Sequence, residues 1–157
     1  MKICLILDRL RSAHNTGNMF RIAEAFGAEI IACGYTPAPP HPKLAKTAMG
    51  AELMVPCRSV PDAATAIRLL RSEGYAMILA AEPGAGSVFA WKKHYEFPLG
   101  IVFGNEALGV SPEALALVDG LVGLPMLGQK TSINVGNAAA AILYAVAATT
   151  EGFEAQA

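Results

Sequence analysis

Residues 100–109 read Gly-Ile-Val-Phe-Gly-Asn-Glu-Ala-Leu-Gly, so an apolar run passes directly into a polar stretch that carries glycines. This pattern is typical of a strand that ends in a loop at the edge of a sheet. Two further segments have the same character: residues 15–21 (Asn-Thr-Gly-Asn-Met-Phe-Arg), and residues 124–134, in which Leu-Pro-Met leads to Ser-Ile-Asn. Together they supply one arginine, one glutamate and a Ser-x-Asn. This set of polar groups indicates one functional site rather than three unrelated loops.

Short apolar runs alternate with helical patterns along the rest of the chain. This alternation predicts an α/β fold with a mainly parallel, six-stranded sheet. Because the strands are apolar almost throughout, we expect helices on both faces of the sheet. The expected strands are Ile3–Asp8, Glu29–Gly34, Leu53–Pro56, Ala76–Ala81, Gly100–Phe103 and Leu121–Leu124, and the expected helices are Asn18–Phe26, Pro61–Ser72, Pro112–Val118 and Asn134–Ala148.

Several helix ends have a local signal. Asn15 or Asn18 is suited to cap the first helix, and Gly27 to end it. Ser111 before a proline predicts the start of the third helix. Asn134 or Asn137 is suited to cap the last one.

The composition favours one domain that buries part of its surface against a partner. A length of 157 residues fits a single domain, residues 1–157. Hydrophobic residues make up 54% of the chain and charged residues 16%, which is more apolar than usual. Residues 134–150 carry no charge, and a helix that is apolar on nearly every side is normally buried all round. We therefore expect a homodimer.

Other classes of protein are disfavoured. The longest apolar run, residues 138–148, has 11 residues, whereas a membrane span needs about 20. The N-terminus lacks the core of a signal peptide, so we expect a cytoplasmic protein with no membrane partner. Cys4, Cys33 and Cys57 form no C-x-x-C pair, so no metal is expected and the thiols should be reduced and mostly buried.

The net charge of −1 is not the footprint of a nucleic-acid-binding protein, but the charge is unevenly distributed. Residues 1–50 hold six basic and three acidic groups, a balance of +3, whereas the remainder holds 6 basic and 10 acidic groups, a balance of −4. Arg9 and Arg11 lie in this basic third, which is a candidate for a phosphate-facing patch.

The three polar segments should meet in space. Ligands of open α/β sheets bind beyond the carboxyl ends of the strands. Leu79 and Ala80 lie near the end of one expected strand, Gly104–Gly109 follows another, and Leu124–Asn134 follows a third. All three would therefore border one pocket.

Each candidate residue also has a plainer interpretation. Arg21 taken alone is a surface or capping arginine, and Glu106 is equally well an exposed loop acid. Ser132 and Asn134 taken alone indicate a helix cap. The joint pattern of the three segments favours function over these separate interpretations.

The segments resemble the three motifs of the SpoU, or tRNA/rRNA 2′-O-methyltransferase, branch of the SPOUT superfamily. Residues 15–21 match N-x-G-N-x-x-R, and residues 103–109 match F-G-x-E-x-x-G. Residues 124–126 and 132–134 match a Leu-Pro-Met followed by S-x-N and an apolar helix. The resemblance extends over essentially the whole chain, from about residue 3 to residue 148.

The resemblance implies an S-adenosylmethionine-dependent RNA 2′-O-ribose methyltransferase that acts on tRNA or rRNA. It also implies a C-terminal trefoil knot, which no periodicity could predict, and a homodimer formed through the C-terminal helix. By position, the residues expected around the cofactor are Leu79, Ala80, Gly104, Asn105, Gly109, Leu124, Met126, Ser132 and Ile133.

A ribose 2′-hydroxyl is a poor nucleophile, so it has to be aligned and deprotonated as it attacks. Arg21 stands where similar enzymes have the proposed base, although a guanidinium is almost never neutral. Its alternative role is to bind a phosphate and stabilise the forming oxyanion. Ser132 and Asn134 would position Arg21 or the ribose, Asn15 would shape the site, and Glu106 would pair with Arg21 or hold its own loop.

The RNA partner is less defined. Residues 46–52 resemble a lysine-containing segment of some family members, which makes Lys46 a candidate for RNA contact beside Arg9 and Arg11. We expect no separate RNA-binding extension, and tRNA is slightly favoured because a small catalytic core can act on an exposed loop.

Two alternatives stay open. The first is a non-catalytic RNA- or cofactor-binding protein that keeps the fold. The second is an ordinary dinucleotide-binding enzyme, but Phe89 stands where the motif beginning at Gly84 needs its third glycine.

Overall fold

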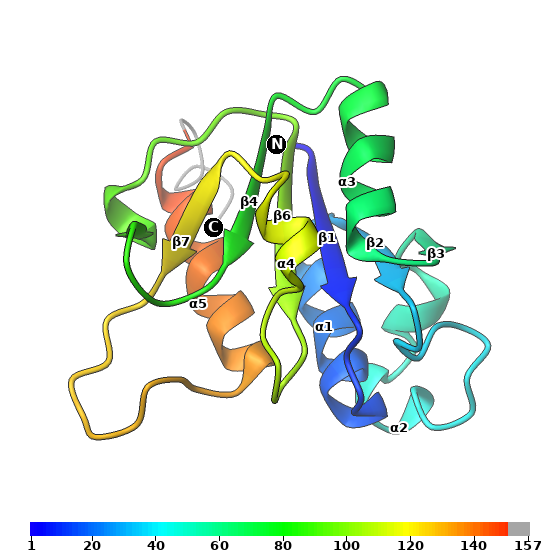
Figure 1. Ribbon diagram of the computed structural model, residues 1–157. Coiled ribbons are helices and arrows are strands. Elements are labelled where there is room, and N and C mark those ends of the chain that lie inside the picture. The colour runs from blue at the N-terminus through cyan, green and yellow to red at the C-terminus, as the bar shows by residue number, and fades with distance from the viewer. Residues whose placement is uncertain (151–157) are drawn as a thin grey trace.

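The computed structural model describes residues 1–150 of the 157. Within these residues, one seven-stranded sheet has the strand order β3-β2-β1-β6-β4-β7-β5, and every pairing between its strands is parallel (Figure 1). The strands are β1 (Ile3–Asp8), β2 (Glu29–Cys33), β3 (Cys57–Val60), β4 (Met77–Ala81), β5 (Ser87–Phe89), β6 (Leu99–Gly104) and β7 (Gly120–Gly123). The helices are α1 (Ala13–Ala25), α2 (Ala45–Ala48), α3 (Ala63–Ser72), α4 (Pro112–Leu115) and α5 (Val135–Ala148), with short 3-10 helices η1 (Ala51–Leu53) and η2 (Ala90–Lys92).

The sheet separates two hydrophobic cores, because successive side chains of a strand point to opposite faces. Ile3, Leu5 and Leu7 of β1 pack into one core, whereas Cys4 and Ile6 pack into the other. All five are buried, and burial of each large aliphatic side chain contributes roughly 1.5–3 kcal/mol. The continuous apolar strands are thus explained by helices on both faces, as expected.

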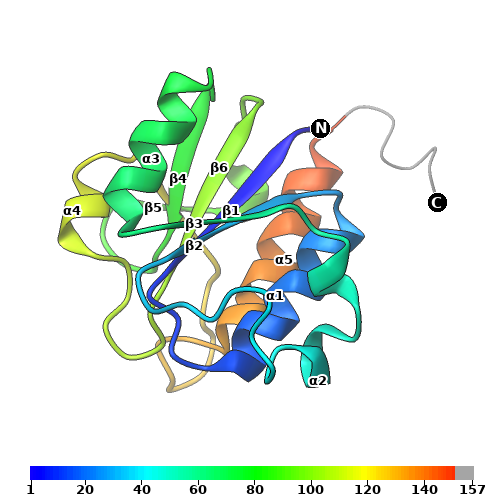
Figure 2. The same ribbon diagram turned by 90° about the vertical axis from the view of Figure 1, so that its right-hand side faces the viewer.

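Helices α1 and α5 lie side by side on one face of the sheet, and α3 and α4 cover the other (Figure 2). The α1–α5 contact depends on Gly136, because a Cβ there would overlap the side-chain nitrogen of Asn18. Absence of a side chain at Gly136 therefore brings the start of α5 close to α1, which sets two of the three polar segments beside each other.

Two strand predictions need correction. The sheet has seven strands rather than six, because the three-residue strand β5 was missed. The strand expected at Leu53–Pro56 is wrong: Leu53 ends η1 with 85% of its surface exposed, and β3 follows at Cys57–Val60. An apolar run of four residues does not distinguish a strand from a short helical turn by periodicity.

The helix ends agree in part with their signals. Asn134 caps α5, since its Oδ1 accepts from the backbone N–H groups of Gly136 and Asn137. Helix α1 begins earlier than expected, because Ser12 rather than an asparagine is its N-cap. The sharp stop near Gly27 is confirmed, with that glycine in the left-handed region at φ 59°.

Helices α3 and α4 are shorter than predicted. Asp62 caps α3 by accepting from the N–H of Thr65, so the helix starts after Pro61. Ser111 is the N-cap residue of α4 by position but makes no side-chain capping bond, and the helix ends at Leu115.

Helix α5 is not buried on every side within one chain. Tyr144 is 59% exposed, and Asn137, Ala141 and Ala148 are also exposed. Burial of the remaining side was expected from a second subunit, and that expectation stays a prediction. The exposed residues follow the 3.6-residue period and form one stripe along the helix.

The three thiols are free, and burial raises the pKa of each of them, to about 12 for Cys33 and about 11 for Cys57. Cys4 and Cys33 are buried and Cys57 is half-buried. None of the helices between residues 1 and 150 combines the length and the apolar character that a bilayer crossing demands.

Candidate active site

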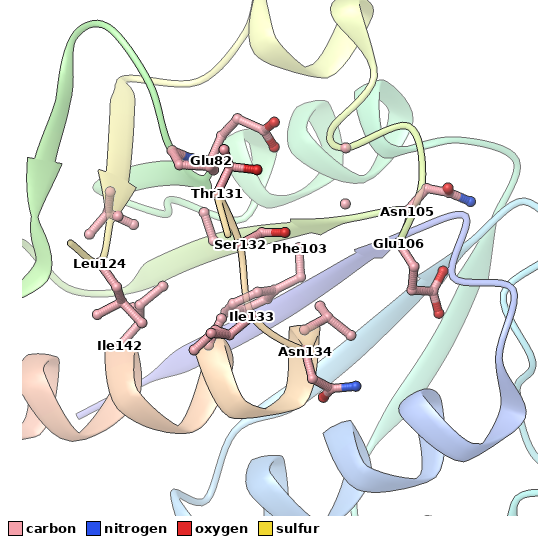
Figure 3. A pocket seen from close by; sticks show the side chains of 18 of the residues that line it. Glu82, Phe103, Asn105, Glu106, Leu124, Thr131, Ser132, Ile133, Asn134 and Ile142 are labelled. Carbon is pink, nitrogen blue, oxygen red and sulfur yellow. The ribbon is translucent and has the colours of Figure 1, made fainter. Parts of the chain in front are cut away.

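A cavity of about 470 Å³ opens at the carboxyl edge of the sheet, where the connections after β4, β6 and β7 converge. Figure 3 shows Leu124 and Ile142 at one end of this hollow and Asn134 and Glu106 at the other, with Glu82 on the opposite wall. The volume lies in the range of small-molecule and cofactor sites. The edge predicted from the motifs is therefore the edge that carries the cavity.

The asparagines of the first and third motifs are in direct contact with each other. The side-chain amide of Asn134 donates to Oδ1 of Asn15 at 2.9 Å. Asn15 in turn donates from Nδ2 to Oε1 of Glu106 at 3.0 Å. A chain of hydrogen bonds therefore joins all three motifs at the mouth of the cavity.

Glu106 connects the motif-two loop to the beginning of α1. Its carboxylate also accepts from the backbone N–H groups of Arg11 at 3.1 Å and Ser12 at 3.3 Å. Burial raises the pKa of this carboxyl, but the hydrogen bonds from Asn15, Arg11 and Ser12 outweigh burial and hold the pKa below its ordinary value. Glu106 is therefore an ionised acceptor at neutral pH, as in the predicted role of holding its own loop.

Asn105 holds the same loop from inside. Its Oδ1 accepts from the backbone N–H groups of Ala107 and Leu108 at 2.8 and 2.9 Å, and its Nδ2 donates to the carbonyl of Arg9 at 2.7 Å. Gly104 has to be glycine for the loop to fold back, because a Cβ there would overlap the backbone of Gly109. These contacts explain the Phe-Gly-Asn-Glu pattern in physical terms.

Most residues expected around the cofactor line the cavity: Gly104, Asn105, Gly109, Leu124, Met126, Ser132 and Ile133. Leu79 and Ala80 do not line it and are buried within β4 instead. Strand β4 continues to Ala81, so the wall of the cavity is formed by the next residues, Ala81, Glu82 and Pro83. An acid directly after an apolar strand was the signal that identifies Glu82 in the sequence.

Arg21 lies away from the cavity. It is exposed, it does not line the hollow, and its Nη1 is 3.4 Å from Sδ of Met49. Six residues separate it from Asn15, which is about 1.7 helical turns and places the two side chains on different faces of α1. Within the described residues of one chain, Glu106, Ser132 and Asn134 form no hydrogen bond or ion pair with Arg21. The alternatives, in which Glu106 holds its own loop and Ser132 and Asn134 position the ribose, stay open.

The candidate RNA-binding residues lie on two connections. Arg9 and Arg11 follow β1; Arg9 is half-buried, with Nε 3.0 Å from Oδ1 of Asp8, and Arg11 is exposed. Lys46 is exposed on α2, which packs against α1. Among residues 1–150, His, Cys, Asp and Glu side chains form no group of three that could hold a metal ion.

The lining of the cavity fits S-adenosylmethionine. Phe103, Leu124 and Ile142 offer apolar surface for an adenine ring, and Glu82 and Glu106 offer carboxylates. Within the described part of the chain, no lysine or arginine lines the cavity. A negative, partly apolar pocket suits a ligand that carries a sulfonium and an ammonium group.

Fold and cavity together define a cofactor-dependent α/β enzyme of the type that binds its ligand at the carboxyl ends of parallel strands. Comparison with known families makes the class specific: residues 2–144 match the SpoU rRNA Methylase family, and the chain belongs to that family.

Individual relatives agree with this assignment. The chain is 34% identical to the tRNA (guanosine(18)-2′-O)-methyltransferase of Thermus thermophilus over 90% of its own length and 72% of that enzyme. It is similar to the AdoMet-bound rRNA methyltransferase of Sinorhizobium meliloti, with a TM-score of 0.83, 29% identity, and coverage of 92% of this chain and 55% of that one. It is also similar to the SpoU methyltransferase AviRb of Streptomyces viridochromogenes in complex with AdoMet, with a TM-score of 0.80, 28% identity, and coverage of 90% and 55%.

The predicted family, enzyme class and cofactor are thereby confirmed. The chain spans only about half the length of these two solved structures, at 55% of each. Its RNA substrate and its partners are therefore proposals.

Proposed function

We propose that this chain transfers a methyl group from S-adenosylmethionine to the ribose 2′-hydroxyl of a tRNA or rRNA nucleotide. The observation that carries the proposal is the hydrogen-bonded chain Asn134–Asn15–Glu106 at the mouth of the cofactor-sized cavity. It places the polar groups of all three motifs at one point, where a ribose can approach the cofactor.

The chain's own residues act mainly by alignment. S-adenosylmethionine supplies the methyl group on its sulfonium centre when it is bound. Asn15 and Asn134, each fixed by the other, hold the ribose, and Ser132 offers a further hydroxyl on the same wall. Orientation of this kind accounts for a large share of the rate gain in group transfer. A 2′-hydroxyl target requires RNA rather than DNA.

The described lining of the cavity offers no cation for the reacting oxygen. Charge develops on the attacking oxygen, yet the described lining of the cavity contains carboxylates and no basic side chain. Arg21 is too far round α1 to serve its own cavity, but it is exposed and free to approach a second subunit. We propose that Arg21 completes the partner's site, where it binds a phosphate and stabilises the oxyanion.

The exposed stripe of α5 supports a homodimer. Asn137, Ala141, Tyr144 and Ala148 line one side of the helix, and the Tyr144 ring packs edge-on against Phe26, the C-cap residue of α1, with centroids 4.9 Å apart. Figure 2 shows α1 and α5 as neighbours, so the surface formed by the α5 stripe adjoins α1 at the Tyr144–Phe26 contact. Burial of this surface between two copies would account for the charge-free sequence of α5.

Three finer points accompany the proposal. A tRNA is the favoured substrate, supported by the activity named for the Thermus relative. The cytoplasm is the proposed compartment, because tRNA and rRNA are processed there. We also propose that the C-terminal part forms the trefoil knot of the superfamily, supported by family membership and by the convergence of the loops after β4, β6 and β7.

The test is transfer of a labelled methyl group from S-adenosylmethionine to total tRNA and to total rRNA. Asn134→Ala and Arg21→Ala are assayed in parallel with calorimetric measurement of cofactor binding. Alkali-resistant label in one RNA pool, lost in both variants, supports the proposal and identifies the substrate. Cofactor binding with no transfer to either pool supports the non-catalytic alternative.

A further inference from the structure

One aromatic ring next to the site has no role in the chemistry above. Tyr35 follows β2 and is 58% exposed. Its hydroxyl accepts a hydrogen bond from Nδ2 of Asn105 at 3.0 Å. Asn105 lines the cavity and directly precedes Glu106. The ring of Tyr35 therefore spans from the end of β2 to the motif-two loop while its face stays open to solvent.

Both the backbone neighbours of Tyr35 and the hydroxyl of its ring are fixed in place. Gly34, on one side, adopts the left-handed region at φ 61° and ends the strand. Thr36, on the other side, is buried, and its Oγ1 accepts from the N–H of Leu10 at 3.0 Å. A tyrosine has two side-chain torsions, and the bond to Asn105 fixes its tip. An exposed ring fixed in this way has little conformational entropy to lose when a ligand packs on it.

Two arginines lie on the connection after β1, and Arg9 packs near both residues that anchor Tyr35, Gly34 and Asn105. A Cβ at Gly34 would lie 3.2 Å from Cγ of Arg9, so the Arg9 stem packs against Gly34, the residue before Tyr35. Nε of Arg9 donates to Asp8, which leaves the other four N–H donors of the guanidinium for a ligand. Arg11 is exposed, and its backbone N–H binds Glu106. An exposed ring next to two arginines is the combination that binds single-stranded nucleic acid, by base stacking and phosphate contact.

We propose that Tyr35 is a stacking platform for a base of the RNA substrate, adjacent to the ribose that is methylated, with Arg9 and Arg11 on the neighbouring phosphate. The inference rests on the proposed function. Asn105 links this platform to the cavity, so the same side chain that shapes the cofactor loop sets the distance between stacked base and reacting ribose. Stacking tolerates any base, so the platform fixes the position of an unpaired nucleotide rather than its identity.

Two substitutions separate stacking from a structural role. Tyr35→Phe keeps the ring and removes the hydroxyl that Asn105 binds, whereas Tyr35→Ala removes both. Trp91→Ala is the matched control, because Trp91 is an exposed aromatic residue, 53% accessible, in η2 next to β5 at the edge of the sheet. Its environment beyond β7 is remote from Tyr35, which follows β2 on the far side of β1.

The probe is a short single-stranded RNA that contains 2-aminopurine, whose emission falls when the base stacks. With the full chain, we expect Tyr35→Ala to weaken RNA binding by about tenfold or more and to relieve the loss of emission. Tyr35→Phe keeps the ring and should lose much less than Tyr35→Ala, and Trp91→Ala should retain both. S-adenosylmethionine affinity should be unchanged in all three, and thermal unfolding confirms that each is folded.

Equal losses in Tyr35→Phe and Tyr35→Ala would overturn the proposal, because the residue would then act through Asn105. Unchanged RNA binding in Tyr35→Ala would overturn it as well. If the wild-type chain methylates no RNA pool but shows stacking that depends on Tyr35, the proposed function fails and the platform stands. If methylation proceeds normally in Tyr35→Ala, the function stands and the platform fails.

Discussion

Asn134 and Asn15 are 119 residues apart in the chain, and their side chains share a hydrogen bond of 2.9 Å. Asn134 simultaneously caps α5 through its Oδ1, which accepts from the N–H of Gly136 at 2.9 Å. One amide therefore stabilises a helix and fixes the asparagine of the first motif. The plain interpretation of this residue as a helix cap is confirmed, and its functional role stays a prediction.

Replacement of Asn134 by alanine should affect stability and activity together. Loss of the cap costs about 1 kcal/mol of unfolding free energy, and the misplacement of Asn15 lowers methyl transfer by about 100-fold. Urea unfolding and labelled transfer measure the two effects. Arg68→Ala, a change of an exposed residue on α3 across the sheet, is the control. Activity that survives in Asn134→Ala would show that Asn15 needs no partner.

The hydrogen bonds of ionised Glu106 should contribute to the free energy of unfolding in a pH-dependent way. Its folded pKa lies below the ordinary value of 4.5, so its hydrogen bonds contribute fully above about pH 4.5 and are lost as the pH falls through the folded pKa. The difference in unfolding free energy between wild type and Glu106→Gln should therefore shrink below pH 4.5. Urea midpoints at neutral and acid pH measure it, with Glu113→Gln, an exposed acid of α4, as the control. A difference that is independent of pH would contradict the prediction.

If Arg21 acts in the partner's cavity, inactive Arg21→Ala and Asn134→Ala subunits should complement each other. Arg21→Ala and Asn134→Ala dimers should each be inactive, yet a mixture refolded together should regain methyl transfer. In a mixed dimer, one cavity has its own intact Asn134 and receives Arg21 from the other chain. Mixing without subunit exchange is the control. A mixture that stays inactive would place Arg21 and Asn134 in the same subunit's site.

Tyr144 tests the dimer surface. A charge introduced by Tyr144→Asp would be buried unpaired in the proposed interface, so we expect dissociation into monomers and loss of methylation together. Sedimentation at several protein concentrations measures the change. Arg68→Asp, an exposed change on α3 across the sheet, should leave the assembly intact. A dimer that persists in Tyr144→Asp would exclude α5 as the contact.

Gly104→Ala tests the packing of the motif-two loop, and Gly128→Ala is its control. A Cβ at Gly104 would overlap Gly109 and Val110, whereas a Cβ at Gly128 meets no atom within 4 Å. Gly104→Ala should therefore destabilise the fold by about 1–3 kcal/mol and weaken cofactor binding. Gly128→Ala should change unfolding free energy by less than about 0.5 kcal/mol. Chemical unfolding and calorimetric titration with S-adenosylmethionine measure both quantities.

Local patterns in the sequence were enough to predict the class of fold and the composition of the site. Apolar runs and turn residues predicted the parallel α/β architecture and the carboxyl edge as the site, because each depends on neighbours within a few positions. The family resemblance implied most of the named residues of the cavity. Strand β5 was not predicted, because three residues are too few to show a periodicity. The shift from Leu79 to Glu82 arose because a strand's last residue depends on its partner strands.

By itself the sequence determined the alternation of strands and helices, the three motifs, and the family they define. Only the tertiary structure decided which motif residues meet. The strand order places β6 between β1 and β4, which brings Glu106 to the start of α1. The rotation of α1 turns Asn15 toward the cavity and Arg21 away from it. Contacts between distant segments depend on how whole elements are oriented, and that information is absent from the spacing of residues along the chain.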